Sequence, residues 1–236
     1  DTKSRDDILK AIRQLADIHN ILREFPMEIP DYLQVGGNAL LEENERHTRE
    51  LKKVRNYISS RKKKSDFERG FLKSFEMFYG EAVEVVELQK QELGNTMGQE
   101  GANGIYGICH GDYNQHNVLF SRQGIAILNF EKASYDIQAS DLGNFMRKIL
   151  EKHNWNMGLG MDMVNAYHKI RPLGRQEMRQ LYIRLAYPEK FWKITNHYFN
   201  TSKAWVCGRN LEKLDKFISQ NEARESFLHL IGAEVP

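Results

Sequence analysis

Apolar side chains recur at helical spacing over much of this chain. From Asp7 onward they repeat every three or four residues as far as Leu22, and Pro26 with Pro30 ends the pattern. A second, highly charged helix is expected over 40–58. Four phenylalanines then follow one another at intervals of four, four and three residues, the spacing of a buried helix face: Phe67, Phe71, Phe75 and Phe78. Residues 1–100 are therefore predicted to form a helical region.

The pattern changes between residues 105 and 131. Short runs rich in β-branched and aromatic residues appear here, IYGIC, NVLF and IAILNF, and the SRQG stretch between the last two is typical of a tight turn. Helical spacing then returns and predicts helices over 142–152, 161–170, 175–186, 188–200 and 211–231. Helix dominates, with one small β insert.

The β insert carries closely spaced polar residues. Asp112 stands in the stretch HGD, Asn117 follows five residues later, and the hairpin returns to the stretch NFE at Asn129. Phosphoryl transfer to a hydroxyl needs a carboxylate that orients and deprotonates the hydroxyl, and oxygen ligands for the Mg²⁺ that bridges the nucleotide phosphates. The spacing makes Asp112 a candidate base, Asn117 a candidate amide ligand, and position 129 the place for a metal-binding carboxylate. A short polar loop of this composition also forms turns without any ligand.

These residues resemble the aminoglycoside-phosphotransferase-like branch of the protein-kinase-like fold, and within it the spore-coat CotS family. The stretches HGDYNQHNVLF, ILNFEKASYDIQASDLGNFMRK and QLADIHN carry the resemblance. It implies a mainly helical α+β fold, the C-terminal lobe of a kinase-like protein with a β-hairpin catalytic insert. Residues 1–236 would form this one lobe, with a helical region over 1–100, the catalytic and metal loops over 105–131, and a helical substrate-side region over 141–236.

The resemblance also implies a role for each residue of the motif. Asp112 matches the catalytic base, and His110 matches the residue that braces its loop. Asp141 matches a buried acid that supports the catalytic loop from the following helix. The expected metal and cofactor ligands are Asn117, Asn129 and Glu131.

Two departures from the family limit this expectation. Asn129 stands where the family usually has its metal-binding aspartate, and a neutral amide is a poor replacement for a carboxylate around a hard divalent cation. The small β lobe that holds the nucleotide would precede the first helix, and we expect it to be absent from this chain. ATP and Mg²⁺ are thus expected cofactors if the protein is active, and no cofactor otherwise.

Two functions follow from the resemblance, and the sequence does not decide whether the chain is an enzyme. The first is a CotS-like phosphotransferase that moves the γ-phosphate of ATP to a small-molecule or sugar-like hydroxyl, impaired by Asn129 and the missing lobe. The second is a pseudokinase that serves as a non-catalytic binding or assembly module, for example in the spore coat. The expected partners are accordingly a hydroxyl acceptor or spore coat proteins.

Composition narrows the expected partners and location. The formal net charge is only +2, so nucleic-acid binding would rest on the RKKK run at 61–64, for which a solvated turn is the simpler interpretation. No apolar run approaches the roughly 20 residues of a membrane span, and no membrane partner is expected. Cys109 and Cys207 make no disulfide framework. The resemblance implies a bacterial protein located in the cytoplasm or the spore coat, and the two cysteines are consistent with synthesis inside the cell.

Other residues have both a functional and a structural interpretation. His116 either reaches a substrate phosphate or faces solvent from its loop. Arg147 and Lys148 either neutralise an anionic substrate or lie on the solvated surface. Four aromatic residues of the C-terminal region either line a small pocket or, as the simpler interpretation, pack in the core: Trp155, Trp192, Tyr198 and Trp205.

Overall fold

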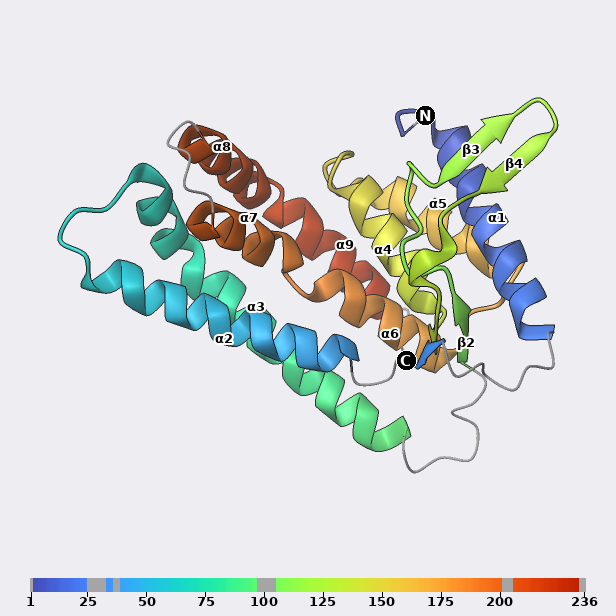
Figure 1. Ribbon diagram of the computed structural model, residues 1–236, viewed down its shortest axis with the longest axis horizontal. Coiled ribbons are helices and arrows are strands. Elements are labelled where there is room, and N and C mark those ends of the chain that lie inside the picture. Colours follow the sequence, from blue (N-terminus) through green and yellow to red (C-terminus); the bar gives the residue numbers. More distant parts are fainter. Residues whose placement is uncertain (1, 25–32, 36–38, 97–104, 201–205, 234–236) are drawn as a thin grey trace. The chain divides into compact units, whose positions relative to one another are not determined.

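The computed structural model describes residues 2–24, 33–35, 39–96, 105–200 and 206–233 (Figure 1). The chain divides into two compact units. One comprises Asp1–Gly37, Thr96–Leu185 and Ala223–Pro236, and the other comprises Asn38–Asn95 and Ala186–Glu222. The division of the chain expected from the sequence stays a prediction. Within the described ranges, no helix has the length and apolar character needed to cross a membrane.

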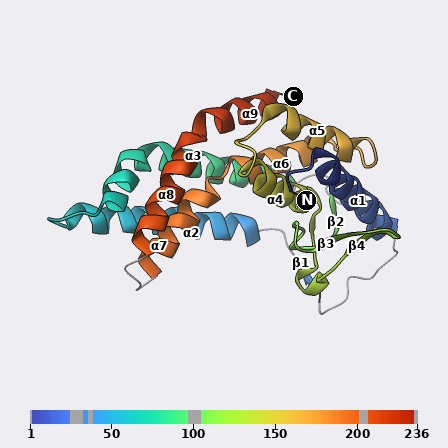
Figure 2. The same cartoon turned by 90° about the horizontal axis from the view of Figure 1, so that it is seen from above.

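The first unit contains α1, α4 and α5 together with nearly all of α6 and α9. These helices span Arg5–Glu24, Ala139–Leu150, Met157–His168, Arg175–Ala186 and Asn221–Ala233. Helix α5 packs against both α1 and α4 (Figure 2). Ser4 caps α1 by accepting the backbone N–H of Asp7 at 3.2 Å. One face of α1 is buried, as its apolar spacing predicts: Ile8, Ala11, Ile12, Leu15, Ala16 and His19.

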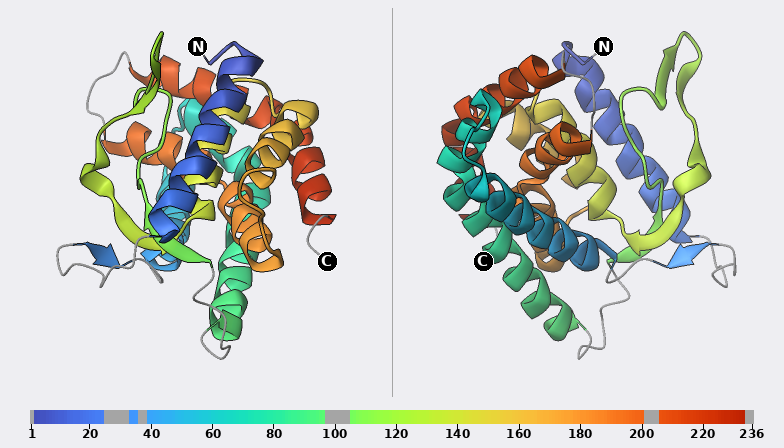
Figure 3. Two further views of the ribbon diagram at one scale, coloured as in Figure 1. Left: turned by 90° about the vertical axis from the view of Figure 1, so that its right-hand side faces the viewer. Right: turned by 60° about the vertical axis from the view of Figure 1, so that its left-hand side comes forward.

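Two small sheets complete the first unit. In the three-stranded sheet, β5 (Ser134–Ile137) lies between β1 (Gln34–Val35), to which it is parallel, and β2 (Tyr106–Cys109), to which it is antiparallel. Strands β3 (Val118–Ser121) and β4 (Gly124–Ile127) form the predicted hairpin, which lies beside α1 (Figure 3). The sequence patterns predicted neither β1, which has two residues, nor β5, which has four, because runs this short give little periodicity.

The second unit is helical. It contains α2 (Ala39–Ser60), most of α3 (Asp66–Thr96), α7 (Glu189–Asn200) and α8 (Val206–Ser219). All four phenylalanines of the predicted α3 stripe are buried, and the ring of Phe71 stacks on Phe191 with 5.2 Å between centroids. Ser65 and Glu68 form a capping box at the start of α3, each side chain accepting the other's backbone N–H. The charged run 61–64 lies in the turn before α3, mostly exposed.

The prediction of a single helix over 211–231 is wrong, because the structure has two helices there. Helix α8 ends at Ser219 and α9 begins at Asn221. The backbone N–H of Gln220 donates to the carbonyl of Phe217 at 3.2 Å, an i→i−3 bond that closes the last turn of a helix. The polar run Ser-Gln-Asn at 219–221 interrupts the apolar repeat at this point.

The aromatic residues of the C-terminal region pack against other rings. Trp155 is buried and faces Phe227 with 6.1 Å between ring centroids, whereas Tyr198 stacks on Phe67 at 4.0 Å. Trp192 stacks on His47 at 3.3 Å. Core packing is therefore the role of these three side chains. Trp205 lies outside the described residues.

Candidate active site

The loop between β2 and β3 carries the HGD motif, and a glycine sets its path. Gly111 has a φ of 78°, a conformation that L side chains rarely adopt. A Cβ atom at this position would lie only 1.8 Å from the backbone oxygen of Lys132. The loop therefore passes directly against the short 3₁₀ turn η2 (Phe130–Lys132) and places Asp112 beside that turn.

Asp141, in the first turn of α4, holds the start of this loop. Its buried carboxylate accepts the backbone N–H groups of His110 at 2.6 Å and Gly111 at 3.0 Å. His19 of α1 approaches the same carboxylate, with 3.3 Å between Nε2 and Oδ2. A buried carboxylate is tolerated only when donors surround it in this way, so α1, α4 and the loop are joined at one charge.

His19 connects Asp141 to the interior of the unit. Because a carboxylate can only accept, Nε2 of His19 donates to Asp141, and Nδ1 accepts the hydroxyl hydrogen of Tyr167 at 2.6 Å. Burial lowers the pKa of His19 despite the opposing influence of Asp141, and burial raises the pKa of the Tyr167 hydroxyl. The sequence patterns assigned no role to Tyr167, which lies 148 residues from His19.

His110 links the loop to the end of the hairpin. Its Nδ1 accepts the backbone N–H of Asp112 at 3.2 Å, so Nε2 carries the proton and donates to the carbonyl of Leu128 at 2.8 Å. The imidazole is buried, and both of its nitrogens are engaged by the protein. The side chain of His110 thus holds the loop in place by geometry, and it has no free nitrogen for a substrate.

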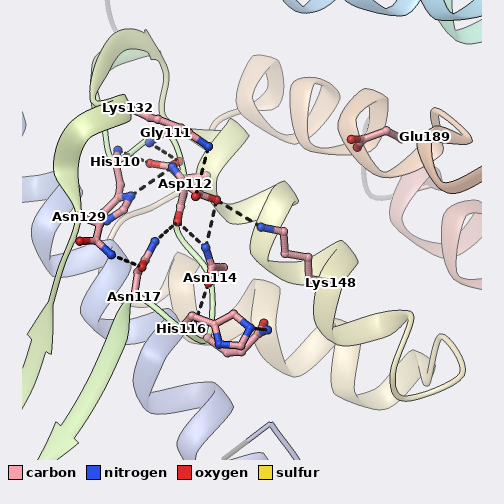
Figure 4. A network of polar contacts seen from close by, with 12 residues as sticks. His110, Gly111, Asp112, Asn114, His116, Asn117, Asn129, Lys132, Lys148 and Glu189 are labelled. Carbon is pink, nitrogen blue, oxygen red and sulfur yellow. Dashed lines mark hydrogen bonds and ion pairs between the residues drawn. The ribbon is translucent and has the colours of Figure 1, made fainter. Parts of the chain in front are cut away.

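Asn117 and Asn129 form a pair of amides. Asn117 donates Nδ2 to the carbonyl of Asp112 at 2.9 Å, and because a carbonyl only accepts, its Oδ1 must face Asn129. Asn129 donates Nδ2 to that oxygen at 2.8 Å (Figure 4). The backbone of Asn129 has a φ of 62°, in the left-handed region that asparagine tolerates better than most residues. The amide oxygen of Asn117, the atom that would bind a metal ion, therefore already accepts an N–H donor with one of its two lone pairs.

The carboxylate of Asp112 lies between two ammonium groups. Lys132 approaches Oδ2 and Lys148 approaches Oδ1, each at 3.5 Å, and Asn114 donates to Oδ1 at 3.0 Å (Figure 4). Partial burial opposes ionisation, but the Asn114 hydrogen bond and the charges of Lys148 and Lys132 outweigh it and hold the pKa of Asp112 below its usual value. Asp112 is thus an ionised hydrogen-bond acceptor at neutral pH. Sequence patterns gave no role to Asn114 or Lys132.

Glu131 lies outside this network. Its side chain is exposed on η2, and it makes no hydrogen bond or ion pair with Asp112, Asn117 or Asn129 in the part of the chain that the structure describes. The same described ranges hold no group of three His, Cys, Asp or Glu residues that could bind a metal ion. The donors left for Mg²⁺ are neutral amides and a carboxylate already paired with two cations. These residues do not fit a magnesium site.

The other residues considered from the sequence differ in burial and in the groups that they contact. Arg147 is buried and pairs with Glu151 at 2.9 Å, whereas its neighbour Lys148 reaches the candidate site. His116 is exposed, and it lines a cavity of about 300 Å³ whose walls come from α1, β3 and α4. Cys109 is buried, and burial raises the pKa of its thiol, which suits a structural cysteine.

The arrangement of helices, hairpin and anchored loop is that of a kinase-like phosphotransferase fold. An aminoglycoside phosphotransferase from Alicyclobacillus acidocaldarius subsp. acidocaldarius DSM 446 is similar with a TM-score of 0.85 and 20% identity, over 100% of this chain and 68% of that chain. Plasmodium vivax ethanolamine kinase Pv091845 has a TM-score of 0.52 and 15% identity, over 94% of this chain and 59% of that chain. Amicoumacin kinase hAmiN, in complex with AMP-PNP, Ca²⁺ and Ami, has a TM-score of 0.50 and 12% identity, over 93% of this chain and 59% of that chain. The expected fold class is confirmed.

The sequence of the chain also identifies its family. Residues 2–231 match the family described as "Spore coat putative kinase YutH", and the chain belongs to that family. Spore coat protein S of Bacillus subtilis (strain 168) is 25% identical over 124 residues, which are 52% of this chain and 35% of that protein. The matched region thus spans only part of that curated relative. The expected resemblance to kinase-like spore coat proteins is confirmed.

Proposed function

We propose that this chain is a kinase-like module of the spore coat that has lost most or all metal-dependent phosphoryl transfer and acts in binding or assembly. The observation that carries this proposal is the hydrogen bond from Asn129 to Oδ1 of Asn117. A divalent cation at this oxygen would have to share it with, or displace, the N–H donor of Asn129, and at position 129 it would meet a neutral amide in place of a carboxylate. Because electrostatic stabilisation dominates phosphoryl transfer, this loss costs several orders of magnitude in rate.

The location in the spore coat and a binding role have separate support. Family membership and the similarity to spore coat protein S favour the coat. The loop around Asp112 keeps an ionised acceptor held by Asp141 and by Asn114, which is suited to bind a hydroxyl whether or not a phosphate is transferred to it. Coat proteins that contact this module are the proposed partners.

A second candidate is ATP-dependent phosphorylation of a small-molecule or sugar-like hydroxyl, with ATP and Mg²⁺ as cofactors. The ionised, oriented Asp112 favours it, as does the similarity to a kinase solved with AMP-PNP and Ca²⁺. Two other similar proteins are named for an aminoglycoside and for ethanolamine, which are both amines. The ammonium groups of Lys132 and Lys148 beside Asp112 would repel a cationic acceptor.

A thermal-shift titration of the complete gene product with ATP, with and without Mg²⁺, separates the two candidates. The proposal predicts no magnesium-dependent stabilisation of the natural protein, and a gain of magnesium-dependent ATP binding in Asn129→Asp. Asn154→Asp is the matched control, because Asn154 also has a positive φ, of 49°, and belongs to no part of this network. Magnesium-dependent stabilisation of the natural protein, with transfer of phosphate to a hydroxyl compound, would establish the second candidate instead.

A further inference from the structure

We propose that the site beside Asp112 binds an oxyanion carried by a hydroxyl-bearing small molecule, held by Lys132 and Lys148 without a metal ion. The oxyanion is a phosphate monoester or a carboxylate. This inference rests on the proposed function in one respect, since it takes the site to be free of divalent metal. It adds the chemical class of the ligand and names the two side chains that recognise it.

The geometry places two cations around one carboxylate. Lys132 comes from η2 and Lys148 from α4, and their Nζ atoms lie 3.5 Å from different oxygens of Asp112. An ammonium group has three N–H donors, and each lysine directs at most one to Asp112. A distance of 3.5 Å is long for a hydrogen bond, so these pairs are weak and the remaining donors are available to a ligand.

Within the described residues, the ion pairs at the site join two lysines to one carboxylate. Two ammonium groups face the single carboxylate of Asp112, and the neighbouring side chains of Asn114 and Asn117 are neutral. Among the described residues, Glu131 pairs with neither lysine. The buried carboxylate of Asp141 is engaged by the backbone N–H groups of His110 and Gly111, so the charges that reach the exposed part of the site among the described contacts are two ammonium groups and one carboxylate, a balance that favours an anion over a divalent cation.

Exposure leaves the lysines open to a ligand. The side chain of Lys132 is 71% exposed, and those of Lys148 and Asp112 are each 35% exposed. An oxyanion that accepts from both ammonium groups would lie next to the Asp112 carboxylate, which would repel it unless the same molecule also offers a donor. A hydroxyl on the ligand supplies that donor to Asp112. For this reason the expected ligand carries both groups.

The test is calorimetric binding to the complete gene product in EDTA. The probes are glycerol 3-phosphate, glycerate, inorganic phosphate and, as the neutral control, glycerol. We expect an oxyanion to bind and glycerol not to bind, with stronger binding of glycerol 3-phosphate or of glycerate showing which oxyanion the site prefers. Lys132→Met and Lys148→Met should each weaken binding about tenfold, the effect of one charge-assisted hydrogen bond. Lys148→Arg should retain most of it.

Two further variants serve as controls: one should leave binding unchanged, and the other should strengthen it. Lys152→Met removes an exposed ammonium group four residues from Lys148, outside the site, and should leave binding unchanged. Asp112→Asn should strengthen the binding of inorganic phosphate, because it removes the repelling carboxylate and frees both lysines. Thermal unfolding of each variant establishes that it folds.

Three results would overturn the inference: no binding of any oxyanion in EDTA, unchanged binding in both lysine-to-methionine variants, or weaker phosphate binding in Asp112→Asn. Its failure is separable from that of the proposed function. A protein without magnesium-dependent turnover that also binds no oxyanion refutes this inference alone. Magnesium-dependent turnover refutes the proposed function, whereas oxyanion binding in EDTA that depends on the two lysines still supports the ligand class.

Discussion

The side-chain amide of Asn129 donates to Oδ1 of Asn117 over 2.8 Å, and Asn117 donates in turn to the carbonyl of Asp112 over 2.9 Å. Each acceptor in this series fixes the orientation of the amide that donates to it. Turning either amide over would oppose two acceptors or two donors. The series thus forms a rigid link between the HGD loop and the turn after β4, made without a metal ion.

Replacing Asn129 by aspartate should weaken this link when no cation is present. A carboxylate at position 129 would face Oδ1 of Asn117, so two acceptors would oppose each other. We expect Asn129→Asp in EDTA to lose about 1 kcal/mol of unfolding free energy, a fall in Tm of about 2–4 °C. Differential scanning calorimetry measures the change. Asn154→Asp should unfold close to the natural protein, and equal losses in the two variants would contradict the account.

Asp141 should contribute more to stability than a surface carboxylate. Asp141→Asn keeps the size of the side chain but turns an amide N–H toward groups that themselves donate: the backbone of His110 and Gly111, and His19. We expect a loss of about 2 kcal/mol in urea unfolding. The control is Asp162→Asn, which removes an exposed ion pair with Arg5 and should cost less than about 1 kcal/mol. Comparable losses would mean that Asp141 does not anchor the loop.

A methyl group at Gly111 should be tolerated far less well than one at Gly124. Both glycines have positive φ, 78° and 139°, but an added Cβ meets the Lys132 oxygen at 1.8 Å in the first case and nothing within 4 Å in the second. Gly124→Ala therefore carries backbone strain alone, about 1–3 kcal/mol. Gly111→Ala adds a clash that must displace η2, so its urea midpoint should be clearly lower. Equal midpoints would be inconsistent with the close approach of the loop to η2.

His19 should make stability depend on pH. Burial holds its folded-state pKa below the value of about 6.5 that applies when the chain is unfolded. Below pH 6.5 the unfolded state therefore binds more protons, and stability falls as the pH falls, by at most about 1.4 kcal/mol per pH unit. His19→Gln should be less stable at pH 7 but lose less stability between pH 7 and 5.

The difference between the natural protein and His19→Gln gives the contribution of His19 to the pH dependence of stability. Burial also lowers the pKa of His47, but that contribution is present in both proteins and cancels in their difference. Urea unfolding at several pH values gives the two curves. Parallel curves would show that His19 titrates alike in the folded and unfolded states.

Local patterns in the sequence predicted the features that depend on neighbouring residues. The phenylalanine stripe of α3 is buried as its spacing indicates, and the SRQG turn joins β3 to β4. The motif from Asp112 to Asn117 lies on one loop because only five residues separate them. The family resemblance added Asp141, which no spacing rule connects to this loop.

Features that depend on distant residues were not predictable in this way. Lys132 and Lys148 lie 20 and 36 residues after Asp112, and His19 lies 122 residues before Asp141. Such contacts form only when helices and loops pack together, so the periodicity of apolar residues along the sequence does not predict them. The sequence also could not predict which amide donates in the pair Asn117 and Asn129. A side-chain amide can both donate and accept, so the direction follows only from its partners in the structure.

Binding of Mn²⁺, a paramagnetic substitute for Mg²⁺, tests the central claim most directly. Electron paramagnetic resonance would follow free Mn²⁺ during titration of the complete gene product, in the presence of ATP, for the natural protein and for Asn129→Asp. We expect the natural protein to leave the signal of free Mn²⁺ unchanged and Asn129→Asp to reduce it. Binding of Mn²⁺ by the natural protein that is lost in Asn117→Ala would contradict the account, because the oxygen assigned to the amide pair would then be a metal ligand.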